Sequence, residues 1–178
     1  ILEHEPELIA HHCTKAGLSA QATPYWLRAG KRAVEQSANA EAIADFGKGL
    51  DLLQDLPDNA DRAQQELSLQ IDLVACMRIL DRYDEALATL DRAQVIAGDL
   101  DRLGDLALIH NYRGNIYFPL GKFETCLEQH QLAADVARRG AAVEQEARAL
   151  SGLGDAYYAQ GQMIKSYDHF QACVDFCR

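Results

Sequence analysis

The side chains that come nearest to a metal-binding cluster are His11, His12 and Cys13, with His4 a few residues upstream. Imidazole and thiolate groups are the usual protein ligands of zinc. Neighbouring residues of a helix point about 100° apart, so His11 and His12 cannot both face one ion. Because no His-Glu-x-x-His pattern accompanies them, we favour packing on a helix face and predict neither a metal site nor another cofactor.

The five cysteines, Cys13, Cys76, Cys126, Cys173 and Cys177, are odd in number and scattered, unlike a disulfide framework. Cys173 and Cys177 are four residues apart and would share one face of a helix. That pair could bind a metal or respond to oxidants. The alternative that we favour is a set of buried or half-buried thiols in a reducing cytosol.

No group of residues in the sequence points to catalysis. A phosphate-binding Gly-x4-Gly-Lys-Ser/Thr loop is missing, and no serine lies in a nucleophile elbow or beside a positioned His-Asp pair. The many carboxylates of an acidic helical protein are solvated by default. We therefore predict that this chain is not an enzyme, and that by itself it neither hydrolyses ATP nor makes a cyclic nucleotide.

The composition narrows the range of partners. The chain has 178 residues, 48% of them hydrophobic, and a net charge of −10. This acidic balance argues against nucleic acid and anionic membranes as partners, because both attract basic surfaces. No apolar run is long enough to predict a membrane span. The chain opens at Ile1 without an initiator methionine or a signal-peptide pattern, so we interpret it as a piece of a longer cytoplasmic protein.

The most informative pattern is an internal repeat. Each unit has a bulky-then-small pair, later a small residue, and four positions after that a large one. The pairs are Ala29-Gly30, Leu73-Val74, Arg113-Gly114 and Leu153-Gly154; the small residues are Ala42, Ala86, Cys126 and Ser166; the large ones are Phe46, Leu90, His130 and Phe170. The small residues recur at intervals of 44, 40 and 40.

The repeat predicts an all-α fold. Apolar residues recur every three or four positions between breakers, which indicates nine helices and no strand. We place the helices at about 4–16, 20–36, 39–56, 59–80, 83–99, 102–119, 123–139, 142–160 and 163–177, with Asp58 as the expected N-cap of the fourth. Residues 1–178 would form one repeat domain: a lone first helix and helix pairs at about 20–56, 59–99, 102–139 and 142–177. Since one pair cannot bury both of its apolar faces, the pairs should stack into a right-handed superhelix.

The repeated residues have a packing role in this prediction. Gly114 and Gly154 would let the two helices of a pair approach closely, and Cys126 and Ser166 would present the matching flat surface on the second helix. His130 stands where two other units have an aromatic residue. It could sense pH, but we favour a neutral, hydrogen-bonded core histidine.

These residues resemble the tetratricopeptide repeat, whose usual period is 34. The match is best from Gly114 to Phe123 and from Gly154 to Gly161, and weaker around Trp26. Two departures are Val74 in place of the small residue and His130 in place of the aromatic one, and the longer period implies longer helices. The resemblance implies an array of helix pairs that binds a protein or a peptide in its concave groove.

A second resemblance covers residues 6–58. This stretch is similar to a bacterial family that joins a class III adenylate or guanylate cyclase domain, an AAA-like ATPase and a C-terminal tetratricopeptide array. The match lies in Pro6-Glu7-Leu8, His11-His12, Ala16-Gly17, Pro24-Tyr25-Trp26, Ala29-Gly30 and Leu56-Pro57. It implies upstream ATPase and cyclase domains in the same protein, whose own motifs this chain lacks.

The tetratricopeptide pattern also nominates a partner-binding groove, lined by the first helix of each pair. The nominated residues are Arg78, Asn111, Tyr112, Asn115, Phe118, Asp155 and Tyr158. Asn115 and Asp155 are forty residues apart, hence equivalent in adjacent units. Pro119 has no N–H, so the carbonyl of Asn115 loses its partner four residues on and would be open to the groove. The alternative is that Pro119 only ends a helix and that Asn115 is solvated.

Two classes of function follow from these patterns. In the first, the chain is a regulatory module that binds a protein or peptide and acts on an upstream ATPase or cyclase; a variant is the sensor region of an ATPase-type transcriptional regulator. In the second, it is a scaffold for oligomerisation. The last helix carries Ile164, Tyr167, Phe170, Val174 and Phe176, which a second copy of the chain or further repeats should cover.

Replacing Gly154 by leucine should destabilise the chain severely, because a bulky side chain at a close helix crossing overpacks it by roughly 1–3 kcal/mol or more. Gly140→Ala, in a turn, should act by another route, the loss of a positive φ. Thermal unfolding followed by circular dichroism measures both. An unchanged melting temperature for Gly154→Leu would show that Gly154 does not lie at a helix interface.

Overall fold

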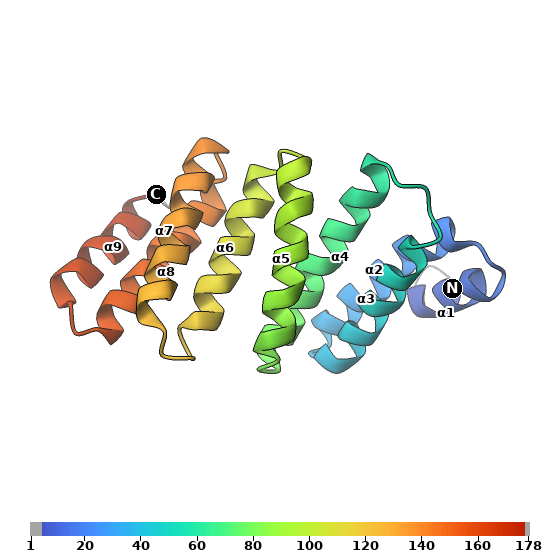
Figure 1. Cartoon of the computed structure of the whole chain (residues 1–178). Coiled ribbons are helices and arrows are strands. Elements are labelled where there is room, and N and C mark those ends of the chain that lie inside the picture. Colours follow the sequence, from blue (N-terminus) through green and yellow to red (C-terminus); the bar gives the residue numbers. More distant parts are fainter. Residues whose placement is uncertain (1–4, 177–178) are drawn as a thin grey trace. The chain divides into compact units, whose positions relative to one another are not determined.

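The computed structural model describes residues 5–176, and all regular structure within them is helical, as predicted (Figure 1). The nine helices of this range are α1 Pro6–Lys15, α2 Ser19–Glu35, α3 Asn39–Leu53, α4 Ala60–Ile79, α5 Tyr83–Asp99, α6 Leu103–Tyr117, α7 Phe123–Arg139, α8 Val143–Ala159 and α9 Met163–Phe176. Their ends fall within about three residues of the predicted ones. None of them is long and apolar enough to cross a bilayer.

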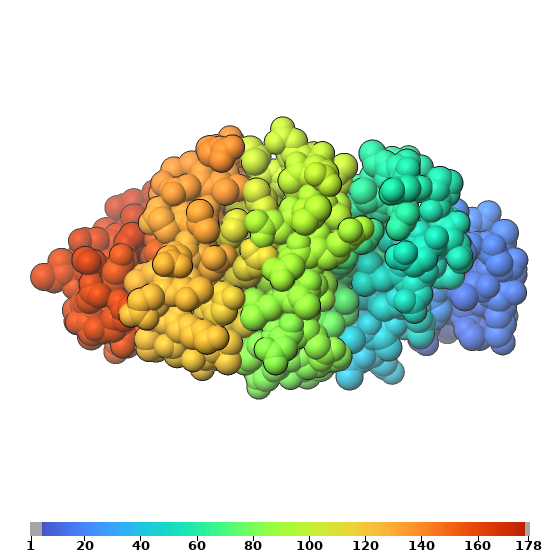
Figure 2. Space-filling model, viewed as in Figure 1, coloured from blue at the N-terminus to red at the C-terminus, as the bar shows by residue number. Residues whose placement is uncertain are grey.

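The chain divides into two compact units. The N-terminal unit comprises residues 1–96, where α1 packs on α2, α2 on α3 and α3 on α4. The C-terminal unit comprises residues 97–178, where α6, α7, α8 and α9 pack in succession and α6 also contacts α8. Side chains fill the space between successive helices of each unit (Figure 2). Successive helices from α1 to α4, and from α6 to α9, therefore pack against their neighbours in sequence, as a helical repeat requires.

Seven of the turns between helices have the same geometry. One residue in each has a positive φ: Gly17, Ser37, Asp81, Asp101, Gly121, Ala141 and Gly161. The next N–H bonds back to the carbonyl five residues earlier, as from Leu18 to Cys13 at 2.9 Å and from Ala142 to Ala137 at 2.9 Å. This is the Schellman ending of a helix, which satisfies carbonyls that would otherwise lack a partner. From Asp81 to Gly161 the positive-φ residue recurs every 20 residues, which sets the 40-residue period.

The turn between α3 and α4 differs and accounts for the longer interval of 44. Residues 54–59 contain no positive φ, and α4 is 20 residues long whereas α5 and α7 have 17. The N-cap of α4 is Asn59, whose side-chain oxygen accepts a hydrogen bond from the Arg62 N–H at 2.9 Å. Our prediction of Asp58 as the cap was wrong by one residue. An asparagine oxygen serves as well as a carboxylate at this position, so residue type does not distinguish the two.

The repeated glycines face large rings of the second helix, and not the small residues Cys126 and Ser166 that we had expected opposite to them. A side chain at Gly30 would overlap the ring of Phe46, and a side chain at Gly154 would overlap that of Phe170. In the second pair the equivalent residues are Val74 and Leu90, both fully buried. Valine in place of glycine is thus accompanied by leucine in place of a ring, so the summed volume changes little.

Gly140 packs differently from what its place in a turn suggested. Its φ is −90°, and the positive φ belongs to the next residue, Ala141, at 50°. A Cβ on Gly140 would lie 2.7 Å from the Cβ of Leu103. The expected role for Gly140 in a positive-φ conformation was therefore wrong; glycine is needed there because α6 begins close by.

His130 fills the space between two glycines. It is 2% exposed, and a Cβ on either Gly114 or Gly152 would overlap its ring. The Nδ1 atom lies 3.1 Å from Oδ1 of Asn111, whose Nδ2 donates to the carbonyl of Gln145 at 2.9 Å. Since the amide nitrogen faces a carbonyl, Oδ1 must accept from His130, so Nδ1 carries the proton of the neutral ring. Burial lowers the pKa of His130 to about 4, in agreement with a neutral core histidine.

Replacing Ala141 by glycine should stabilise the chain, because a non-glycine residue in the left-handed region costs roughly 1–2 kcal/mol. We expect Ala141→Gly to raise the free energy of unfolding by about 1 kcal/mol, measured by urea denaturation. The matched control is Ala172→Gly in α9, an exposed helical position where glycine should destabilise by a similar amount. Gly140→Ala should also destabilise, by overlap with Leu103. Equal effects of Ala141→Gly and Ala172→Gly would contradict this account of the turn.

Stability should fall as the pH drops from about 6.5 to about 4, through His130. In that window the unfolded chain binds a proton that the folded chain excludes, so the contribution is complete above about 6.5 and lost below about 4, up to about 3 kcal/mol. Urea denaturation at about pH 7 and about pH 4.5 measures the difference for the wild type and for His130→Phe. Titration of the carboxylates is common to both proteins. The variant should show the shallower pH dependence; parallel curves would contradict the assignment.

Candidate functional site

Five of the seven nominated partner-binding residues lie on or just after α6 and α8 of the C-terminal unit, and we call this set the α6/α8 face. They are Tyr112 and Asn115 on α6, Phe118 just after it, and Asp155 and Tyr158 on α8. The two helices pack against each other. Asn115 and Asp155 occupy the same position of successive repeats, so their side chains leave α6 and α8 in corresponding directions.

The other two nominated residues are placed elsewhere. Arg78 is half-buried in the last turn of α4, in the N-terminal unit. Asn111 is only 2% exposed, and its amide is occupied by His130 and by the carbonyl of Gln145. Its nomination as a groove residue was wrong, because the side chain joins α6, α7 and α8 inside the unit. Spacing along α6 could not reveal this, since the partners are 19 and 34 residues away.

Asp155 has the most unusual electrostatic environment on the α6/α8 face. It lies at the surface of α8, yet nearby protein atoms displace part of its hydration and raise the pKa of its carboxyl. Burial, and after it the charge of Asp155, raises the pKa of the Cys126 thiol to about 11. Among residues 5–176 no ion pair involves this carboxylate. A partly desolvated charge without a counter-ion is unfavourable in the free protein and would gain from a bound cation or N–H donor.

The remaining groups of the face offer hydrogen bonds and apolar contact. Asn115 is half-buried, and α6 ends at Tyr117, two residues before Pro119. Proline cannot donate to the Asn115 carbonyl, so that oxygen lacks its usual helical partner. The exposed ring of Phe118 packs edge-on against Phe123, with centroids 5.7 Å apart. An amide, a carboxylate and aromatic rings can bind a peptide, but they include no nucleophile with a base beside it.

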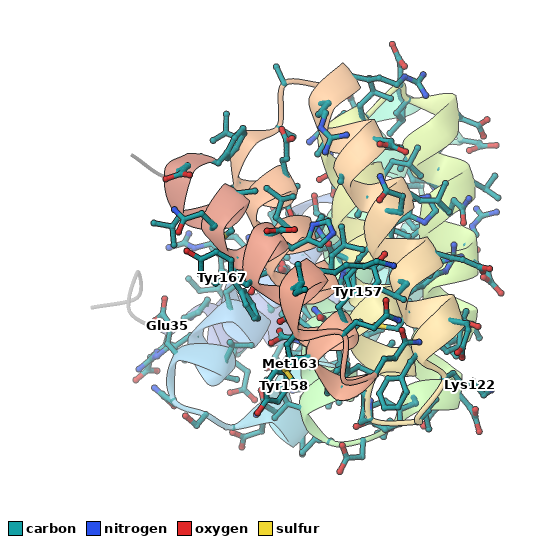
Figure 3. All side chains as sticks on the ribbon, turned by 90° about the vertical axis from the view of Figure 1, so that its left-hand side faces the viewer. Glu35, Lys122, Tyr157, Tyr158, Met163 and Tyr167 are labelled. Carbon is teal, nitrogen blue, oxygen red and sulfur yellow. The ribbon has the colours of Figure 1, made fainter. Side chains whose placement is uncertain are left out.

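A second exposed surface lies on α9 and the end of α8. Of the five residues singled out on the last helix, Phe170 is half-buried against Gly154, whereas Ile164, Tyr167, Val174 and Phe176 are exposed. The exposed fractions of Ile164 and Tyr167 are 80% and 67%. Met163 and Tyr158 are exposed beside them; the repeat pattern does not mark Met163, and it nominates Tyr158 for the groove only. Figure 3 shows Tyr158, Met163 and Tyr167 on the end of the unit that faces the viewer.

The candidate metal and redox residues stay apart where the structure describes them. Between residues 5 and 176 no three His, Cys, Asp or Glu side chains come close enough to hold a metal ion. Cys173 is half-buried and directs its thiol to the carbonyl of Ala147 at 3.4 Å. His4 and Cys177, members of the two candidate clusters, lie outside the described residues.

Comparisons with known proteins support a tetratricopeptide array. Residues 105–178, less than half of the chain, match the family model of the tetratricopeptide repeat. The comparison with curated proteins gave no match.

Solved structures resemble the fold at low sequence identity. The apo form of RapI superimposes with a TM-score of 0.77 at 10% identity, over 99% of this chain and 70% of that one. Aspartyl phosphate phosphatase F from Bacillus subtilis gives 0.76 at 17% identity, over 96% of this chain but only 44% of that protein. MamA from Desulfovibrio magneticus RS-1 gives 0.61 at 17% identity, over 96% and 92%. The chain thus has the helical-repeat fold of these structures, and its C-terminal unit carries the tetratricopeptide signature.

Proposed function

We propose that the chain is a non-catalytic regulatory module of a cytoplasmic bacterial signalling protein, and that its α6/α8 face binds an extended segment of a protein partner. The observation that carries this proposal is Asp155, a carboxylate whose pKa is raised by burial and which has no ion-pair partner within residues 5–176. Residues that lower stability in the free protein are typical of binding surfaces, where the partner supplies the missing interaction.

The chemistry of the face favours a peptide with a basic residue. Lysine or arginine would neutralise Asp155, and a charge-assisted hydrogen bond to the carboxylate is stronger than a neutral one. The amide of Asn115 can donate to and accept from one peptide unit of an extended chain. Exposed Tyr158 and Phe118 provide apolar contact at the end where α6 and α8 terminate.

The link to an upstream ATPase and cyclase rests on the resemblance of residues 6–58 alone. In this proposal, binding at the C-terminal unit alters the activity of the domains that precede the repeats. The same resemblance favours a bacterial, cytoplasmic protein. The variant in which the chain is the sensor region of an ATPase-type transcriptional regulator uses the same face.

A second candidate function is that of an oligomerisation scaffold, which the exposed apolar side of α9 favours. Ile164, Tyr167 and Val174 lie on one helix and are each at least half exposed, and exposed apolar side chains of this kind mark a contact surface. Sedimentation velocity over a range of protein concentrations separates the two functions. Association that Tyr167→Glu abolishes supports the scaffold, and a monomer that binds peptides supports the module.

The binding test uses short random peptides displayed on phage and selected on the chain. For the peptides recovered, Asp155→Asn should weaken binding about tenfold or more, because it removes a charge-assisted hydrogen bond. Fluorescence anisotropy of labelled peptides measures the dissociation constants. The matched control is Glu144→Gln, which removes an exposed carboxylate at the start of α8 and should change affinity less than about twofold. Peptides that bind wild type and Asp155→Asn equally would count against the α6/α8 face.

A further inference from the structure

An apolar groove lies on the side of α8 opposite to Asp155. Its volume is about 500 Å³, and we call it the α7/α8 groove. Leu153 and Tyr157 of α8 line it together with Leu127, Glu128, Gln131 and Leu132 of α7. Residues two apart on a helix point in nearly opposite directions, so Leu153 and Asp155 cannot face the same partner. The groove is therefore separate from the α6/α8 face.

Charged residues stand in another repeat at the positions equivalent to two of these apolar lining residues. The residue forty positions before Leu153 is Arg113, and the residue forty positions before Leu132 is Arg92. The repeat thus accommodates a cation at both positions. Leu132 is 44% exposed, so much of its apolar surface is open to solvent, whereas Leu153 is packed inside the unit. An exposed apolar residue where an equivalent position is charged points to contact with another molecule.

The groove is also held in a defined shape. The ring of Tyr157 stacks on His169 of α9, with centroids 5.3 Å apart and planes at 11°. Nζ of Lys165 lies 5.1 Å from the centroid of the same ring. Leu153 is almost completely buried, so it is fixed at the base of the groove. A surface that is ordered before binding loses little conformational entropy when a partner docks.

The charge beside the groove indicates which sign of charge the partner should carry. Glu128 is exposed and takes part in no ion pair among residues 5–176, whereas the nearby Asp135 is already paired with Arg138. Lys165 and Asp168 of α9 carry opposite formal charges and together add no net charge beside the groove. The net charge of the chain is −10, which favours a cationic partner at longer range.

The backbone groups of the groove indicate whether the bound segment of the partner is a helix or an extended chain. The α7 and α8 walls use their N–H and C=O groups in their own helices, so they offer none to an extended peptide. Against the apolar lining such a peptide would leave its own backbone groups without partners. A helix satisfies its backbone internally and presents side chains at every third or fourth position.

We propose that the α7/α8 groove binds one amphipathic helix of a partner protein. Large aliphatic or aromatic side chains of that helix rest on Leu153, Tyr157 and Leu132, and a lysine or arginine beside them faces Glu128. Because this surface is separate from the α6/α8 face, one C-terminal unit holds two partners, or two segments of one partner, at the same time.

The test uses a fluorescent synthetic peptide of leucine and lysine, about four helical turns long, with its glutamate analogue as the charge control. Anisotropy at about 0.15 M salt gives the dissociation constants for the chain and its variants. Leu132→Ser and Glu128→Lys should each weaken binding about tenfold. The matched controls, Val143→Ser and Glu35→Lys, change an exposed valine and an exposed glutamate that do not line the groove, and they should stay within about twofold.

Three outcomes would overturn the proposal. The first is no binding of the leucine-lysine peptide, or equal binding of its glutamate analogue. The second is an equal loss of affinity in Glu35→Lys and Glu128→Lys, which would show attraction to the net charge only. The third is a loss caused by Asp155→Asn, which would place the helix on the α6/α8 face. Failure of the α6/α8 face to bind extended peptides leaves these results unaffected.

Discussion

The contact of a large ring with a glycine is the interaction on which each helix pair depends. Where glycine stands on the first helix, the second approaches until a ring lies on the bare backbone, as with Gly30 and Phe46 or Gly154 and Phe170. In the pair with Val74 and Leu90, two fully buried side chains of intermediate size occupy the equivalent positions. The summed volume of the two facing residues therefore sets the separation of the helices. A larger residue on one helix has to be matched by a smaller one on the other.

Around His130 this contact becomes polar and joins three helices. The imidazole lies against glycines of α6 and α8, and Asn111 connects it to the backbone of α8. A phenylalanine at this position would fill the space but would leave the Asn111 oxygen without its donor. The hydrogen bonds thus specify how α8 sits on α6 and α7. A second proton, on Nε2 of His130, would place a charge in the core and is disfavoured. This arrangement also directs the rest of α8, and with it the residues of both candidate binding surfaces.

Alternate residues of α8 belong to the two candidate binding surfaces. Asp155 and Tyr158 are the nominated residues of the α6/α8 face, whereas Leu153 and Tyr157 line the groove beside α7. One side combines a carboxylate with an amide, and the other is apolar with a single carboxylate at its edge. A helix held by neighbours at several points can present both chemistries without moving, which is the general advantage of repeat scaffolds in recognition.

The sequence by itself determined the nine helices of the described range and the period, because these follow from local apolar spacing. It identified the glycines as positions of close helix contact, but it did not predict the rings opposite to them. It also nominated the α6/α8 face, through the equivalence of Asn115 and Asp155, and this nomination stays a prediction. Only the tertiary structure decided that Asn111 is internal, that Ala141 rather than Gly140 takes the positive φ, and that an apolar groove lies beside α7. Each of these depends on residues distant in sequence or on a one-residue shift of a helix end. Spacing within one helix carries no information about what the neighbouring helix places opposite to it.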